Sequence, residues 1–148
     1  MLVMFAVLAA FARRTRGASR RAFEGVSVAT QALLLSVHGM TIAVGLGWPV
    51  AVERVVPFAI SLLFVVIGAF MPGLSPNPVI GIRMPWTMRS PAVWRETHRW
   101  TGKLYVHGGL LLALASVAGA SFWAVFAGFL LLGLVPVLYS LRVARRLG

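Results

Sequence analysis

Long apolar runs separated by short basic segments constrain this sequence more than any other feature. Apolar residues dominate 26–50, 55–71 and 104–139. A helix needs about 20 predominantly apolar residues to cross a membrane. The chain is 59% hydrophobic and only 11% charged, whereas a soluble domain carries about 25% charged residues. The sequence therefore predicts an integral membrane protein built from helices.

The lengths of these runs predict an all-α polytopic transmembrane helical bundle with four full spans. Residues 26–50 and 55–71 provide one span each. The run 104–139 is too long for one span, and small residues at 119–121 divide it into helices at about 104–119 and 122–141. A further apolar run at 1–12 predicts a short N-terminal helix. We expect residues 1–148 to form a single membrane domain.

Small residues recur within the predicted spans and are typical of helices that pack closely in a membrane. They predict a compact bundle rather than a ligand site. The set comprises Gly39, Gly45, Gly47, Gly68, Gly109 with Ala113, and Ala124 with Gly128.

The basic residues predict how the bundle is oriented. Five lie in 13–21, five in 83–103 and three in 142–146, and only Arg54 lies elsewhere. With four spans, all three clusters fall on the same side. Cytoplasmic loops are enriched in Lys and Arg, so we expect a bacterial plasma (inner) membrane protein whose loop 72–103 and C-terminus are cytoplasmic. The net charge of +11 is thus explained by the orientation of the chain in the membrane. We therefore expect no nucleic-acid partner.

The segment 72–103 differs from an ordinary hydrophilic linker. Its first half combines four prolines with the apolar residues Val79, Ile80 and Ile82, which predicts an ordered loop folded onto the bundle. Ser90-Pro91 should begin a helix, because Ser is a favourable N-cap and Pro suits the first helical position. We expect an amphipathic interfacial helix there that runs straight into the next span. Its basic face would meet anionic lipid headgroups (Arg95, Arg99, Lys103), and a second set of residues marks another face (Trp94, His98, Thr101, Gly102, Tyr105).

Several motifs in this segment resemble the SdpI family of bacterial integral membrane proteins. The similar runs are Pro76-Asn77-Pro78, GIRMPWT at 81–87, VWRETHR at 93–99 and Gly102-Lys103-Leu104, with further similarity at 46–47, 53–57 and 67–68. The resemblance covers about 26–142. It departs from the family at Ala69, where members usually have Asn, and in lacking the additional N-terminal membrane region that many members carry.

The resemblance implies a non-enzymatic protective or immunity role, since the family includes a protein that confers immunity to a secreted membrane-active toxin. That protein also sequesters a transcriptional repressor at the membrane. A membrane scaffold that recruits a cytoplasmic regulator is therefore one alternative function. A small transporter or channel is another, because His38 lies near the middle of the predicted span 26–50 and intramembrane ionisable groups are functional candidates. A neutral His38 bonded to a neighbouring helix is the simpler explanation.

We predict a binding site in the motif segment. Its arginines would donate bidentate hydrogen bonds to a lipid phosphate or to an acidic group of a toxin peptide, and tryptophans would wall the site. In the alternative interpretation, Arg83 holds loop carbonyls, the Trp residues anchor the interface and Asn77 builds a turn. The candidate residues are Asn77, Gly81, Arg83, Pro85, Trp86, Thr87, Trp94, Thr97, His98 and Arg99.

Metal-dependent catalysis is not expected. His98 and His107 are nine residues apart, which places them on opposite sides of a continuous helix. There is no HExxH motif, no paired-carboxylate arrangement and no cysteine. We therefore predict no catalytic residues, no metal ligands and no cofactor.

Overall fold

The structure is a computed structural model that describes residues 18–77 and 80–147. Within these ranges the chain is helical and contains no β-strand. The helices are α2 (Ala18–Gly45), α3 (Val52–Phe70), the 3₁₀ turn η1 (Met71–Gly73), α4 (Pro85–Arg89), α5 (Pro91–Val117) and α6 (Phe122–Leu147). The short helix predicted at 1–12 lies outside the described residues.

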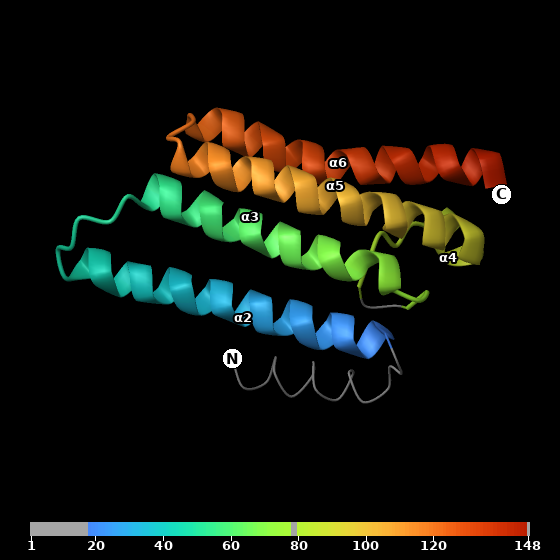
Figure 1. The fold of residues 1–148 in the computed structure, drawn as a ribbon, viewed down its shortest axis with the longest axis horizontal. Helices are drawn as coiled ribbons and strands as arrows, with labels where there is room; N and C mark the ends of the chain where they lie inside the picture. The colour runs from blue at the N-terminus through green and yellow to red at the C-terminus, as the bar shows by residue number, and fades with distance from the viewer. Residues whose placement is uncertain (1–17, 78–79, 148) are drawn as a thin grey trace.

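The four long helices lie side by side in the order α2, α3, α5, α6, each antiparallel to its neighbour (Figure 1). The turns that join α2 to α3 and α5 to α6 lie at one end of the bundle. The connection from α3 to α5, which includes α4, lies at the other end together with the end of α6 (Figure 1). We call this second end the loop end.

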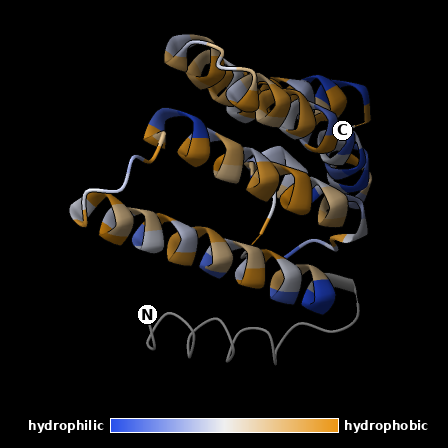
Figure 2. Cartoon of the chain, turned by 60° about the vertical axis from the view of Figure 1, so that its left-hand side comes forward, coloured by the Kyte–Doolittle hydropathy of each residue, from blue (hydrophilic) through white to orange (hydrophobic). Residues whose placement is uncertain are grey.

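Within the described residues, three helices are long and apolar enough to cross a membrane: Arg20–Gly45, Val52–Gly73 and Phe122–Leu147. They correspond to the predicted spans 26–50, 55–71 and 122–141. Figure 2 shows hydrophobic residues along the long helices, with hydrophilic residues concentrated towards their ends. Large apolar side chains also point outwards from the bundle, among them Leu111, Leu114 and Leu131. Such an apolar exterior is expected for a multi-pass membrane protein.

The predicted interfacial helix and the fourth predicted span, 104–119, form one continuous helix, α5, of 27 residues, as expected from the sequence. Its first half contains Arg95, Arg99 and Lys103, and α5 is not among the three helices that are apolar enough to span by composition alone. Helix α2 also begins earlier than the predicted span 26–50. The exposed pair Arg20–Glu24, 2.8 Å apart, stabilises helical turns that precede the apolar run.

Helices α3 and α5 pack at glycines. A Cβ atom added at Gly68 would lie 2.8 Å from the carbonyl oxygen of Gly102, and one added at Gly109 would lie 2.8 Å from that of Ser61. No real side chain tolerates such distances, so the two backbones are in direct contact. This close approach aligns the polar start of α5 with the end of α3, and it positions the loop between them.

Candidate functional site

Helix α5 begins where the sequence predicts. The Ser90 side chain accepts a hydrogen bond from the Val93 N–H at 3.4 Å, and Pro91 occupies the first turn. The second predicted face of the helix is buried at all five of its residues (Trp94, His98, Thr101, Gly102, Tyr105). The basic residues Arg95, Arg99 and Lys103 are exposed.

His98 joins α5 to the loop through both ring nitrogens. Its Nε2 accepts a hydrogen bond from the Ile82 N–H at 3.0 Å. Because a backbone amide can only donate, Nε2 carries no proton, and Nδ1–H donates to the Trp94 carbonyl at 2.8 Å. Burial lowers the pKa of His98 below its ordinary value, although the hydrogen bond to Trp94 acts in the opposite direction. The geometry and the burial both favour a neutral imidazole.

Trp94 is fully buried and holds the same loop at a second point. Its Nε1–H donates to the Leu74 carbonyl at 2.7 Å, and its ring stacks on His98 with the centroids 3.9 Å apart and an interplanar angle of 19°. We call Leu74, Gly81, Ile82, Trp94 and His98 the loop anchor. Through it, two points of the loop are attached to one face of α5.

Gly81 is the position in the loop anchor where only glycine fits. Its φ of +120° is rarely adopted by L-residues. A Cβ atom at this position would also overlap Nε2 of His98 and approach the Trp94 ring. The absence of a side chain thus allows Ile82 to reach the imidazole.

Helix α4 attaches the second half of the loop. Pro85 occupies its first turn, and the buried Thr87 hydroxyl donates to the Ile82 carbonyl at 2.6 Å while accepting from the Met84 N–H at 2.9 Å. Trp86 Nε1–H donates to Ser140 Oγ on α6 at 2.9 Å. Helix α4 is therefore bonded to α6 as well as to the loop.

The remaining candidates lie apart from the loop anchor. Asn77 Oδ1 accepts from the Ile80 N–H at 2.8 Å and its Nδ2–H donates to the Ser75 carbonyl at 2.8 Å, which is turn geometry. Arg83 and Arg99 are exposed. Thr97 is fully buried, and its hydroxyl has no hydrogen-bond partner in the described part of the chain.

The structure thus brings Gly81, Trp94 and His98 together but leaves the arginines outside. The side chains of Trp94 and His98 form hydrogen bonds with the loop itself. Whether any of these residues binds a ligand remains a prediction.

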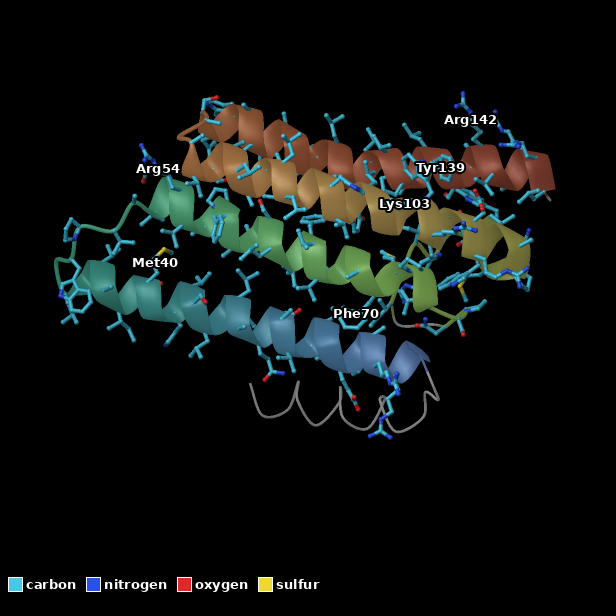
Figure 3. The ribbon with its side chains drawn as sticks, viewed as in Figure 1. Met40, Arg54, Phe70, Lys103, Tyr139 and Arg142 are labelled. Carbon is cyan, nitrogen blue, oxygen red and sulfur yellow. The ribbon has the colours of Figure 1, made fainter. Side chains whose placement is uncertain are left out.

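Arginines and aromatic rings do meet at another place, which sequence analysis missed. An open groove of about 730 Å³ lies between α5 and α6 at the loop end. Figure 3 shows Tyr139 and Arg142 on this part of α6. Both lie closer to the loop end than Lys103 does. We call it the α5–α6 groove; its lining consists of Trp100, Val135, Leu138, Tyr139, Leu141, Arg142, Arg145 and Arg146. The recurrence of Tyr139, Arg142 and Arg146 at helical spacing was the available sequence signal.

The other histidines do not join the loop anchor. His38 lies on α2 with an exposed side chain. His107 is also exposed, and its Nδ1 is 2.7 Å from the Lys103 carbonyl of its own helix. Among residues 18–77 and 80–147, no three His, Cys, Asp or Glu side chains are placed to hold a metal ion.

Comparisons with known proteins agree with the motif pattern. The model of the SdpI/YfhL protein family matches residues 73–140, which comprise the loop, α4, α5 and most of α6. The chain is similar to the Immunity protein SdpI of Bacillus subtilis (strain 168), with 27% identity over 84 residues that cover 57% of this chain and 41% of that protein. It therefore spans less than half the length of this relative. No solved structure matches the chain. Together the two sequence matches support membership of the chain in the SdpI/YfhL protein family.

Proposed function

We propose that all four long helices cross the bacterial plasma membrane, with the loop end on the cytoplasmic side. Helix α5 runs antiparallel between α3 and α6 (Figure 1). In this arrangement residues 104–117 lie in the hydrocarbon part of the membrane and the preceding turn of α5 completes the crossing. The polar start of α5 projects from the bilayer, and Lys103 extends towards the headgroups.

The distribution of charge supports this orientation. Of the basic residues that the structure describes, one, Arg54, lies at the end of the bundle opposite to the loop (Figure 3). The other ten basic residues lie on the elements of the loop end: Arg20, Arg21, Arg83, Arg89, Arg95, Arg99, Lys103, Arg142, Arg145 and Arg146. Since basic residues favour the cytoplasmic side, the loop and the C-terminus are assigned to that side.

Within this topology, we propose a non-enzymatic protective role against a membrane-active toxin or peptide. The observation that carries the proposal is that the match to the SdpI/YfhL family falls on residues 73–140, which contain the loop anchor, and that the chain is similar to an immunity protein. The anchor fixes one conformation of the loop through the bonds of His98 and Trp94. A fixed surface at the membrane interface is suited to recognition, because little conformational entropy is lost on binding.

Protection can be measured directly in a bacterial strain that is sensitive to membrane-active peptides. We expect expression of the chain to raise survival against at least one member of a panel of such peptides. His98→Ala should abolish the gain because it releases the loop. His107→Ala is the matched control: it removes an imidazole from the same helix, but one that bonds only within α5. Wild-type protein that is present in the membrane yet gives no protection against any peptide in the panel would refute the role.

A further inference from the structure

The α5–α6 groove changes in character along α6. Near the end of the helix it is lined by Arg142, Arg145 and Arg146, whose side chains are exposed. One to two turns closer to the centre of the bundle the lining becomes apolar, with Val135 and Leu138. From the end of α6 inwards, the groove surface is first basic, then aromatic and then apolar. This order is complementary to an anionic phospholipid, which runs from its phosphate to its acyl chains.

The aromatic part of the groove is formed by two helices. Trp100 of α5 stacks on Tyr139 of α6 with the ring centroids 4.1 Å apart and an interplanar angle of 16°. Both residues are half-buried. Stacked rings provide a rigid amphipathic wall at the level of the headgroups, where Trp and Tyr are favoured. A ligand could use this wall with little loss of side-chain freedom.

The charge of the groove is not neutralised from within. The Tyr139 hydroxyl donates to Glu96 Oε1 at 3.3 Å, so one carboxylate stands beside three guanidinium groups and leaves a local charge of +2. The ion pair found among the described residues is Arg20–Glu24, on α2; none in that part of the chain involves the groove arginines. Guanidinium groups bind phosphate with paired hydrogen bonds, so the groove is complementary to a phosphate.

From these features we propose that the α5–α6 groove binds one anionic phospholipid of the surrounding membrane. Arg142, Arg145 and Arg146 hold its phosphate, and an acyl chain lies along Val135 and Leu138. This assignment differs from the sequence prediction, in which the headgroups meet Arg95, Arg99 and Lys103. It is independent of the protective role proposed above.

Native mass spectrometry of the detergent-solubilised full chain tests the proposal, with phosphatidylglycerol as the probe and phosphatidylcholine as the neutral comparison. We expect one retained phosphatidylglycerol, preferred over phosphatidylcholine. Retention should be about thirtyfold weaker in R142Q/R146Q, because each basic residue near an anionic lipid contributes about 1 kcal/mol, or about fivefold. The matched control is R95Q/R99Q, which also removes two charges from the loop end but outside the groove. This variant should change retention by less than about twofold.

A second measurement tests the aromatic wall. Phosphatidylglycerol brominated on its acyl chains quenches nearby tryptophans, and the quenching should fall in W100F but remain in W123F, whose tryptophan lies at the opposite end of α6. Equal loss of retention in the two double-arginine variants would overturn the proposal, because it would show a diffuse attraction rather than a site. Displacement of the lipid by millimolar inorganic phosphate would also overturn it, since the site would then recognise a free anion.

Discussion

Replacing Gly81 with alanine perturbs the loop anchor at its tightest point. The new methyl group would meet Nε2 of His98, and the backbone would have to keep a φ of +120°. The substitution therefore combines two costs. One is the strain of a non-glycine residue in this conformation, and the other is the loss of the hydrogen bond from Ile82 to His98.

The magnitude follows from these two terms. Strain of this kind costs about 1–3 kcal/mol, and the lost hydrogen bond adds about 0.5–1.5 kcal/mol. Gly81→Ala should thus weaken loop attachment by about 1.5–4.5 kcal/mol. An energy of 2 kcal/mol corresponds to about a thirtyfold larger population of the open loop.

Trypsin cleavage after Arg83 and Arg89 provides the assay, because both side chains are exposed and cleavage reports the open population. Gly47→Ala is the matched control: Gly47 also has a positive φ, of +81°, but open space around it, and it lies at the other end of the bundle. It should leave cleavage at Arg83 unchanged. In a His98→Ala background the added effect of Gly81→Ala should shrink, since the clash is removed. Cleavage of Gly81→Ala at the wild-type rate would refute the reasoning.

Three further predictions concern other contacts of the same end. The pKa of His98 is lowered from 6.5 by burial, so the attached loop binds fewer protons than the released loop; attachment should be complete above pH 6.5 and be lost as the pH falls further. Hydrogen exchange of the Ile82 amide, corrected for its intrinsic rate, should therefore accelerate in acid, and protection that is constant down to pH 5 would contradict this. Trp86→Phe removes the 2.9 Å bond to Ser140 and should destabilise α4 by about 1 kcal/mol, seen as faster cleavage at Arg89; Ser140→Ala should have the same effect, and the two losses should not add. Gly68→Leu should separate α3 from α5 and lower the melting temperature in detergent, whereas Gly39→Leu, with open space around it, should not; equal effects would exclude the glycine contact.

Local features of the site were predictable from the sequence. The N-cap at Ser90 and the helix face shared by Trp94, His98 and Tyr105 follow from capping preference and helical periodicity, which involve neighbouring residues. The family resemblance also rested on runs of adjacent residues. These parts agree with the structure because they depend on local chemistry.

Contacts between distant segments were not predictable. The partner of His98 is an amide sixteen residues away, Trp86 bonds to a residue 54 positions later, and Trp100 meets Tyr139 across two helices. No periodicity encodes such pairs. The small-residue pattern was informative only in part: Gly68 and Gly109 lie at helix contacts, while Gly39 and Gly45 face open space. Such spacing permits close packing but does not choose the partner.

The absence of cysteine from the sequence makes single-cysteine labelling a clean test of the topology on which the account depends. Met88→Cys and Leu147→Cys would report on the loop end, and Ala51→Cys and Ala120→Cys on the opposite end; all four positions are exposed. With a membrane-impermeant maleimide on intact cells, we predict labelling of Ala51→Cys and Ala120→Cys, and labelling of Met88→Cys and Leu147→Cys only after the membrane is opened. Labelling of Met88→Cys from outside, or from the same side as Ala120→Cys, would show that the loop is not cytoplasmic or that α5 does not cross the membrane.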